Sequence, residues 1–334
     1  MSNHLNQDTL GIMKKVVVIG GGTGSSVVLS ALKNIPDMDL TALPVVTDSG
    51  GSTGRLRDEF GFLPVGDLRQ CLMALADDRT QQDIKKLLLY RFDKGSGLQG
   101  HNLGNLILTA LEDIEKKPGK AIEVASKIFR IKGKVLPITE NSTNLVITYE
   151  DGKKLVGEHF LDDHEKGGKK IVKLELSRPA KLYKKAEEAI LEADIIIVGP
   201  GDIYGSLLPH TLVRGFKEVF KKSTAKFVYI TNLMTHFSQT HDMSASDHVS
   251  VIEEYFGKYP DLVIVNSEKI PDKILKDYEN EKEFPVIDDL PKEKYIKRAN
   301  LVSKVVVKQE KGDSIKRSLL RHNKKALSEV LIKV

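Results

Sequence analysis

The fold of this chain is decided by residues 16–24, VVVIGGGTG, where four apolar residues run directly into a glycine-rich turn. Residues 27–32, VVLSAL, follow with apolar side chains at helical spacing. This order is typical of a buried parallel strand that ends in a turn and opens a helix. Glycines there let backbone N–H groups approach phosphate oxygens, and the helix N-terminus adds partial positive charge. The stretch therefore predicts an α/β fold with a site for a phosphate-bearing nucleotide.

Two further glycine-rich turns follow apolar runs. Residues 43–57 read LPVVTDSGGSTGRLR, and residues 195–206 read IIIVGPGDIYGS. In open α/β sheets, ligands bind beyond the carboxyl ends of the strands, so we expect all three turns to meet at one edge of the sheet, with Asn232 beside them. Arg55 and Arg57 can add charge-assisted hydrogen bonds to a phosphate.

The remaining pattern predicts a single domain. We expect a disordered leader at residues 1–13 and one α/β domain over residues 14–334, built on a Rossmann-related, open and mostly parallel sheet. Short apolar runs punctuated by Asp-Gly and Gly-Gly predict a small β-rich insertion at about residues 133–178. Helices are expected at residues 67–76, 82–90, 106–114, 184–192 and 327–332, and a loop at residues 94–105. Strands are expected at residues 135–138, 145–149, 155–160, 171–176, 195–198, 227–231 and 262–265, with an edge strand at residues 301–307.

Composition excludes several classes of protein. The chain of 334 residues has one cysteine, Cys71, which rules out an internal disulfide framework and favours a reducing compartment, so we expect a cytoplasmic protein. No apolar run approaches the length that spans a bilayer, and we expect no membrane partner. The net charge of +5 is spread over many lysines, and tryptophan is absent, so nucleic acid is not an expected partner.

Other nucleotide and catalytic motifs match less well. A dinucleotide fingerprint aligned on Gly20 needs glycine or alanine where Ser25 stands, and no Gly-Lys-Ser or Gly-Lys-Thr closes a Walker loop. The nine histidines include no H-E-x-x-H arrangement, so no metal site is expected, and His210 and His236 are expected at the surface or in loops. A Ser, His and Asp set within residues 236–248 lacks a nucleophile elbow.

Two aspartates have alternative interpretations. Asp48, between a strand and a glycine turn, can orient a ribose hydroxyl, hold Mg²⁺ through water, or simply form an Asx turn. Asp67, in Gly66-Asp67-Leu68-Arg69, can serve the ligand or cap the helix that follows. Arg69 can pair with Asp67 or reach the ligand.

Taken together, these motifs resemble the YvcK/CofD-like family, and within it the gluconeogenesis-factor (YvcK-type) branch. The stretches that carry the resemblance span residues 15 to about 265 in order and read VVIGGGTG (17–24), VTDSGGSTGRLRD (46–58), LPVGDLR (63–69), GHNLGNL (100–106), GKVLP (133–137), IVGPGDIYGSLLP (197–209) and SASDHV (244–249).

The resemblance implies a Rossmann-like fold and a cytoplasmic regulator that binds UDP-sugars such as UDP-N-acetylglucosamine or UDP-glucose, supporting gluconeogenic growth and cell shape. It implies no required cofactor, no catalytic residue, an unidentified regulatory protein partner, and leaves a homo-oligomer open. Loops at residues 94–105 and 236–248 are expected to close on the ligand. The resemblance and the motifs give these nucleotide-binding candidates: Gly20, Gly21, Gly22, Thr23, Gly24, Asp48, Ser49, Gly50, Gly51, Ser52, Thr53, Gly54, Arg55, Arg57, Asp67, Arg69, His101, Asn102, Asn105, Gly199, Gly201, Tyr204, Ser206, Asn232 and, at the rim, Ser246, Asp247 and His248.

The sister branch of the family gives the alternative. Phospholactate transferase moves a phospholactyl group with Mg²⁺ held by acidic residues near the corresponding turn. Here Ser49 follows Asp48 where many relatives have a second aspartate, which removes a potential metal ligand. Mg²⁺ is therefore expected only if the chain is a Mg-dependent phosphotransferase of this kind, with Asp48 and Asp67 positioning the ion.

Overall fold

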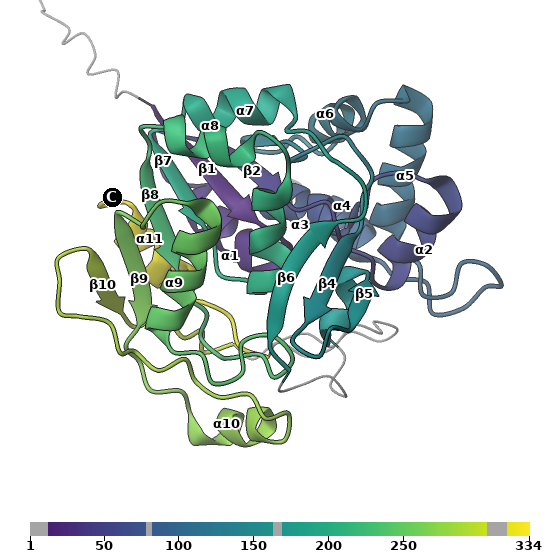
Figure 1. The fold of residues 1–334 in the computed structure, drawn as a ribbon. Helices are drawn as coiled ribbons and strands as arrows, with labels where there is room; N and C mark the ends of the chain where they lie inside the picture. Colours follow the sequence, from purple (N-terminus) through teal and green to yellow (C-terminus); the bar gives the residue numbers. More distant parts are fainter. Residues whose placement is uncertain (1–12, 78–81, 163–168, 306–318) are drawn as a thin grey trace, which may run out of the picture.

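The computed structural model describes residues 13–77, 82–162, 169–305 and 319–334. These residues form a seven-stranded sheet in which every neighbouring pair is parallel, and a separate three-stranded antiparallel sheet (Figure 1). The strands of the large sheet are, in spatial order, β10 (Ile296–Ala299), β9 (Leu262–Asn266), β8 (Lys226–Ile230), β7 (Ile195–Val198), β1 (Lys14–Gly20), β2 (Met38–Pro44) and β3 (Lys134–Val135). The predicted α/β, Rossmann-related fold is confirmed.

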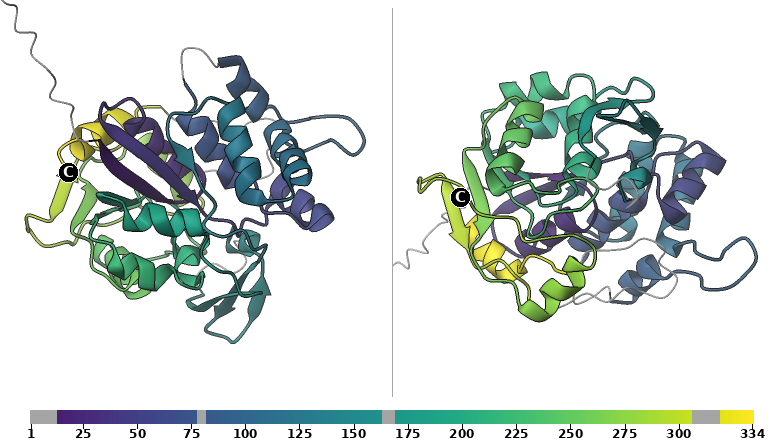
Figure 2. Two further views of the ribbon diagram at one scale, coloured as in Figure 1. Left: turned by 90° about the horizontal axis from the view of Figure 1, so that it is seen from above. Right: turned by 60° about the horizontal axis from the view of Figure 1, so that its bottom comes forward.

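Helices cover both faces of the large sheet, as the two views of Figure 2 show. The α-helices are α1 (Gly22–Leu32), α2 (Gly51–Phe60), α3 (Gly66–Leu75), α4 (Gln82–Leu89), α5 (Leu103–Glu115), α6 (Pro118–Ile128), α7 (Lys184–Leu191), α8 (Phe216–Lys222), α9 (Ala245–Phe256), α10 (Asp272–Glu279) and α11 (Lys324–Leu331). Among the described residues, short helices of other types are η1 (Glu158–Asp162), η3 (Ile203–Leu207) and η4 (Leu208–Leu212).

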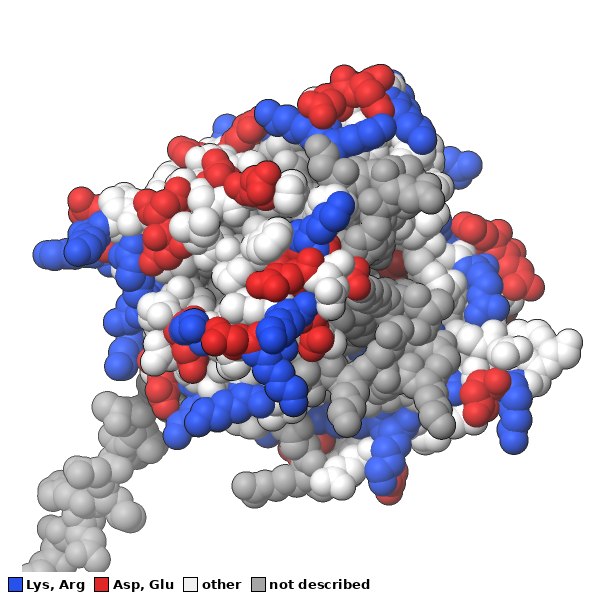
Figure 3. Space-filling model, turned by 90° about the horizontal axis from the view of Figure 1, so that it is seen from below, with Lys and Arg blue, Asp and Glu red and all other residues white. Residues whose placement is uncertain are grey.

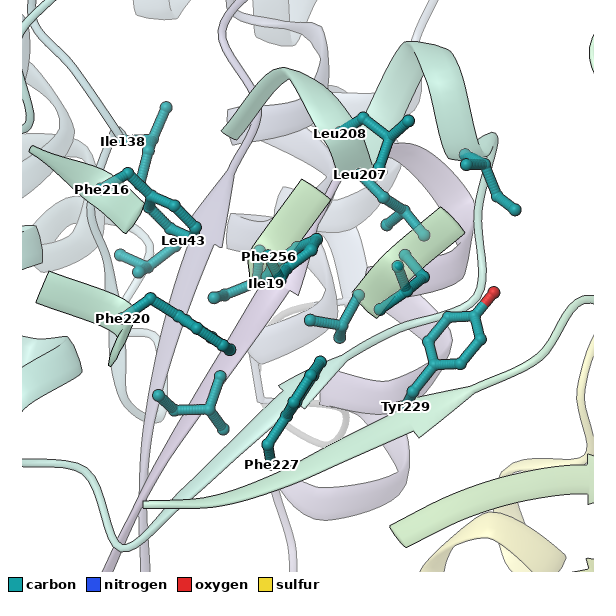
Figure 4. Close-up of a cluster of buried hydrophobic side chains, with 14 of the residues drawn as sticks. Ile19, Leu43, Ile138, Leu207, Leu208, Phe216, Phe220, Phe227, Tyr229 and Phe256 are labelled. Atoms are coloured by element: carbon teal, nitrogen blue, oxygen red, sulfur yellow. The ribbon is translucent and has the colours of Figure 1, made fainter. Parts of the chain in front are cut away.

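Alternate residues of each central strand enter two separate cores. In β1, Val17 and Ile19 pack in the core shared with α7, α8 and α9, whereas Val16 and Val18 pack in the core shared with α1, α3 and α11. Side chains of a strand point alternately to opposite faces, so a continuous apolar run is what a strand buried on both faces requires. Figure 4 shows part of the first core, where Phe220 contacts Phe227 and Phe256 edge-on.

The order of the strands places the site. In the large sheet the chain runs outward from β1 through β2 to β3, then returns to β7 beside β1 and continues through β8 to β10. The direction of progression therefore reverses between β1 and β7. At such a switch point the connections leave on opposite faces and open a crevice beyond the carboxyl ends of the two strands. The glycine turns after β1 and β7 lie at this point.

The small sheet has the order β5 (Lys154–Val156), β4 (Leu145–Tyr149), β6 (Ile171–Leu176). Leu145, Ile147 and Tyr149 of β4 join the core that contains α7 to α9. Within the expected insertion, β3 pairs with β2 at the edge of the large sheet, so the separate small sheet begins later than residue 133.

Three local predictions are wrong. The strand expected at 155–160 ends at Val156, because Gly157 adopts a left-handed φ of 129° and η1 follows. The edge strand is β10 and not residues 301–305, where Val302 pairs with His322 only in an isolated bridge; residues 306 and 307 lie outside the described ranges. His210, expected at the surface or in a loop, lies in η4 and is fully buried, and burial lowers its pKa to about 4. Residues 1–12 of the expected leader also lie outside the described ranges.

Candidate functional site

A cavity of about 530 Å³ opens at the switch point. Its walls include all three glycine turns, which the sequence places at the carboxyl ends of β1, β2 and β7. A volume of this size is typical of a site for a small molecule or a nucleotide. Of the predicted residues, these line it: Gly21, Gly22, Thr23, Gly24, Asp48, Gly50, Gly51, Ser52, Thr53, Asp67, Arg69, Asn105, Gly201, Ser206 and Asn232.

The first turn is closely packed against two neighbouring segments. Gly22 N–H, at the start of α1, donates to Asp67 Oδ1 at 2.7 Å, and Asp67 is buried with 7% exposure. A Cβ atom on Gly24 would lie 1.7 Å from the carbonyl oxygen of Pro200 in the third turn. Only glycine allows this approach, so the sequence brings the first and third turns into direct backbone contact.

The second turn is stabilised by a hydrogen bond between two of its own residues. Gly50 N–H donates to Asp48 Oδ1 at 2.8 Å, which is the Asx-turn arrangement. α2 begins one residue later and has Gly50 as its N-cap, a residue without a side chain to satisfy the first N–H groups of the helix. Helix N-termini of this kind favour negatively charged ligands, and Gly51, Ser52 and Thr53 of this first turn all line the cavity.

Asn232 holds the third turn. Its side chain accepts a hydrogen bond from Gly201 N–H and donates one to Gly201 O, both at 2.9 Å. This reciprocal pair fixes the turn after β7 to the residue that follows β8. Asn232, which the sequence predicts to contact the ligand, thus also shapes the cavity wall.

A buried polar network supports the second turn from behind. Asn102 N–H donates to Ser52 Oγ at 3.2 Å, His101 Nδ1 lies 3.2 Å from the same oxygen, and Asn105 Nδ2 lies 3.3 Å from Thr53 Oγ1. Burial lowers the pKa of His101, and the nearby Arg55 lowers it further, so the ring is neutral at pH 7. His101 and Asn102 therefore position the turn without lining the cavity.

The three predicted arginines have different surroundings. Arg69 is buried and lines the cavity, and its guanidinium donates to Asn105 Oδ1 at 2.8 Å and to Leu88 O at 3.3 Å. Arg57 donates to Asp48 O at 3.1 Å, and exposed Arg55 donates to Gln99 O at 3.1 Å. Neither Arg55 nor Arg57 lines the cavity.

The expected rim residues lie elsewhere. Ser244 and Asp247 form a capping box at the start of α9, and Ser246 donates to Asp289 Oδ2 at 2.6 Å. His248 is fully buried, with its Nδ1 2.7 Å from Ser244 O. A serine with an acid three residues later is a helix-start signal, and this accounts for the motif. The predicted residues that do not line the cavity are Gly20, Ser49, Gly54, Arg55, Arg57, His101, Asn102, Gly199, Tyr204, Ser246, Asp247 and His248.

The small sheet contributes to the wall through η1. His159 N–H donates to Ser49 Oγ at 3.1 Å, and the His159 ring Nδ1 lies 2.8 Å from the same atom. A Cβ atom on Gly205 would lie 2.9 Å from Glu158 Oε1. η1 therefore contacts both the second and the third turn.

Several lining residues come from distant parts of the chain and carry no motif. The loop after β8 is tied to residues 283–286, where Thr235 N–H donates to Phe284 O at 2.7 Å and His236 Nε2 lies 3.6 Å from Glu283 Oε1. The lining residues that the sequence did not predict are Val27, Val45, Gly66, Gln70, Arg91, Glu158, His159, Pro200, Asp202, Gly205, Leu233, Met234, Thr235, His236, Glu283, Leu320, Arg321 and His322. Pro200, Asp202 and Gly205 lie inside a predicted turn, Val45 and Gly66 lie inside quoted motif stretches, and His236 begins a loop that was expected to close on the ligand, so these six could have been found.

The described residues offer neither a metal cluster nor a membrane-spanning helix. No group of three or more His, Cys, Asp or Glu side chains there is placed to hold a metal ion, and no helix there is long and apolar enough to cross a membrane. Figure 3 shows the face of the molecule seen from below, on which Lys and Arg are interspersed with Asp and Glu. Charge on this face is thus mixed, as expected for an ordinary solvated surface.

Comparison with known proteins gives consistent matches. The model of the family described as 2-phospho-L-lactate transferase CofD matches residues 16–307. A gluconeogenesis factor from Halalkalibacterium halodurans is 39% identical over 96% of this chain and 96% of its own. A gluconeogenesis factor from Bacillus subtilis is 37% identical over 97% of this chain and 98% of its own.

A solved structure has the same fold. A crystal structure of an upf0052-family protein from Bacillus halodurans superimposes with a TM-score of 0.85 at 37% identity, covering 96% of this chain and 99% of that chain. The likeness extends over the large sheet and the small one alike, since it covers nearly the whole chain.

Proposed function

The chain belongs to the CofD family, and from this premise we propose that it is a gluconeogenesis factor of the YvcK type that binds a nucleotide sugar of the UDP-N-acetylglucosamine or UDP-glucose class and acts as a regulator. The observation that carries the proposal is the meeting of three glycine turns and two helix N-termini, those of α1 and α2, around one cavity. Such N-termini stabilise phosphate groups. The curated relatives are gluconeogenesis factors, which supports the regulatory branch.

The donor set favours binding without a metal. Mg²⁺ prefers carboxylate oxygens, and position 49 offers a hydroxyl that is already bonded to His159. Arg69 and the N-terminus of α2 supply positive charge for a diphosphate. We place this regulator in the cytoplasm, where UDP-sugar levels would set its interaction with a protein partner and so affect carbon use and cell shape.

A thermal-shift panel tests the proposal. UDP-N-acetylglucosamine, UDP-glucose, GDP, GTP and NAD are each added with Mg²⁺ and with chelator. A ligand at one hundred times its dissociation constant adds about 2.7 kcal/mol to the free energy of unfolding. Stabilisation by UDP-sugars in chelator is the expected result. Stabilisation only by guanine nucleotides with Mg²⁺, or only by NAD, would contradict it.

A second candidate function is a Mg-dependent transferase resembling phospholactate transferase, because the matching family model carries that description. In this reading Asp48 and Asp67, which both line the cavity, would contact the ion. The ion would neutralise charge on the donor phosphates, and the backbone N–H groups of the turns would orient them.

Changing Ser49 to aspartate is expected to convert metal-independent binding into Mg-dependent binding. Position 49 does not line the cavity itself but follows Asp48, which does, so the added carboxylate repels a diphosphate through space and weakens metal-free affinity by about tenfold, while Mg²⁺ restores it. Titration calorimetry with UDP-glucose, with Mg²⁺ and with chelator, measures both affinities. Ser49→Ala is the control, because it removes the hydroxyl bonded to His159 without adding charge. Equal affinities of Ser49→Asp under the two conditions would contradict the expectation.

A further inference from the structure

We infer that Arg91, which no motif singled out, is the arginine that contacts the diphosphate of the ligand, and that this contact is coupled to the loop of residues 92–101. The inference rests on the proposed nucleotide-sugar function. It assigns a phosphate-contacting residue and a moving element to the same site.

Arg91 lies beside the second turn and lines the cavity. Its backbone forms an antiparallel bridge with Asn102, and Asn102 N–H donates to Ser52 Oγ at 3.2 Å. Ser52 belongs to the first turn of α2, where an anionic ligand is favoured. Arg91 is therefore connected to the expected phosphate subsite through one residue, Asn102, whose backbone pairs with Arg91 and donates to Ser52.

The other arginines near this turn are less suited to the role. Arg57 donates to Asp48 O and does not line the cavity, and Arg55 is exposed and donates to Gln99 O. Arg69 lines the cavity, but its guanidinium makes contacts with Asn105, Leu88 and Met73 that hold α3 to α5 and α4. Arg91 combines a place in the cavity wall with a bond to a surface loop.

That bond links the cavity to the loop. Arg91 Nη1 donates to Gly100 O at 3.0 Å. The loop closes on itself at its base, where Phe92 N–H donates to His101 O at 2.9 Å and Gly100 N–H donates to Phe92 O at 2.8 Å. Beyond this base the residues 93–99 are exposed, and Figures 1 and 2 show the loop projecting from the body of the molecule near α2 and α5.

A phosphate group in the cavity and the carbonyl oxygen of Gly100 compete to accept hydrogen bonds from the guanidinium of Arg91. A charge-assisted bidentate bond to phosphate is stronger than a bond to a neutral carbonyl. Turning the fork toward the cavity therefore weakens the anchor at Gly100, and the ligand favours the state in which the loop is released. This is the reverse of the closure on the ligand that the sequence predicts for residues 94–105. This provides the differential affinity that any ligand needs to shift a conformational equilibrium. Gly95, Gly97 and Gly100 all have left-handed φ angles, 95°, 84° and 80°, which a chain with other residues would adopt only with strain.

The absence of tryptophan from the sequence makes the loop directly observable. Leu98 is 42% exposed and lies in the loop, so Leu98→Trp introduces the sole tryptophan of the protein where the movement is expected. Ile332→Trp, at an exposed position that does not line the cavity, is the matched control reporter. Fluorescence quenching by acrylamide is measured for both while UDP-glucose, GDP or pyrophosphate is titrated. Affinity is measured separately by calorimetry.

We expect UDP-glucose to increase quenching of Leu98→Trp and to leave Ile332→Trp unchanged. Arg91→Gln is expected to lower affinity about tenfold or more and to abolish the response of Leu98→Trp even at saturation, whereas Arg55→Gln changes affinity less than about threefold. Arg91→Lys keeps the charge without the fork, so it regains part of the affinity and not the loop response. The melting temperature of each variant confirms folding.

Two results would overturn the inference: parental affinity in Arg91→Gln, or an unchanged Leu98→Trp signal at saturating ligand. If GDP or pyrophosphate binds and UDP-sugars do not, the proposed function fails while the role of Arg91 is still tested with the anion that binds. If none of the three binds, both are wrong.

Discussion

Replacing Gly24 with alanine is expected to abolish nucleotide-sugar binding, with a loss of affinity of at least about one hundredfold. The new Cβ atom would lie 1.7 Å from Pro200 O and 2.6 Å from Pro200 C, and these are backbone atoms that no rotamer change can move away. The first and third turns must separate, so the cavity between them changes shape. The same clash is expected to reduce the free energy of unfolding by about 2–3 kcal/mol.

Gly199→Ala is the matched control for this variant. Gly199 belongs to the third turn, but its Cβ atom would meet Val28 Cγ2 at 3.6 Å, an ordinary van der Waals contact. Calorimetry with UDP-glucose and chemical denaturation are run on both variants. If Gly24→Ala binds as well as Gly199→Ala does, the close approach of the two turns is not required for the ligand.

Glu112→Gln is expected to stabilise the protein at pH 8 and to have little effect at pH 4. Glu112 of α5 is 7% exposed, and its Oε1 accepts a hydrogen bond from Leu63 N–H at 3.2 Å. Burial, with a smaller contribution from the nearby Glu140, raises its pKa from 4.5 to about 7 against the opposing effect of the Leu63 bond. Glutamine keeps an oxygen that can accept the bond from Leu63 and carries no charge.

The direction in which the free energy of unfolding changes with pH follows from proton linkage. Below pH 4.5 the carboxyl group is protonated in the folded and the unfolded chain alike, so its full contribution to stability is present. Between pH 4.5 and about 7 the unfolded chain releases the proton first, and stability falls as pH rises; above that window the loss is constant. Each pKa unit corresponds to about 1.36 kcal/mol, so a shift from 4.5 to about 7 makes the loss that glutamine removes about 3 kcal/mol.

Urea denaturation of both proteins at pH 4, 6 and 8 measures this difference. Glu140→Gln is the control: Glu140 is exposed and acts on Glu112 only through space, so a smaller change in the same direction is expected at pH 8. A Glu112→Gln variant that is less stable than the parent at pH 8 would show that the ionised carboxylate is favourable where it lies.

The large sheet and its glycine turns could be predicted because their signals are local. A run such as residues 195–198 must be buried on both faces, and the glycines that follow it mark the end of the strand. β10 was missed because its sequence, IKRA, lies at the edge of the sheet and needs little apolar side-chain area. His210 was expected at the surface or in a loop because a single histidine gives no sign of the two carbonyl oxygens, Leu43 O and Leu207 O, that its ring contacts in the core.

About half of the lining residues escaped prediction for a different reason. Glu158, Glu283 and Arg321 reach the cavity only because separate segments fold over the same edge of the sheet. Their local sequences contain no glycine turn or repeat that would mark them. The closing movement predicted for residues 236–248 stays a prediction, and the segment makes ordered contacts in this structure. Thr240 Oγ1 accepts from His236 N–H at 2.8 Å, Ser238 bonds to Leu161, and the segment from Ala245 onward is already part of α9.

The residues that line the cavity come from sequence positions as far apart as Gly21 and His322, and this determines when the site can form during synthesis. Gly21–Gly24 are translated early, whereas Leu320, Arg321 and His322 leave the ribosome about 300 residues later. α1 and β1 can pair with β2 during synthesis, but the binding site is completed only after the last of these segments has folded back onto the sheet. If the proposed function holds, a nascent chain that lacks Leu320, Arg321 and His322 is unable to capture the nucleotide sugar, and the ligand stabilises against proteolysis only chains in which these residues are in place.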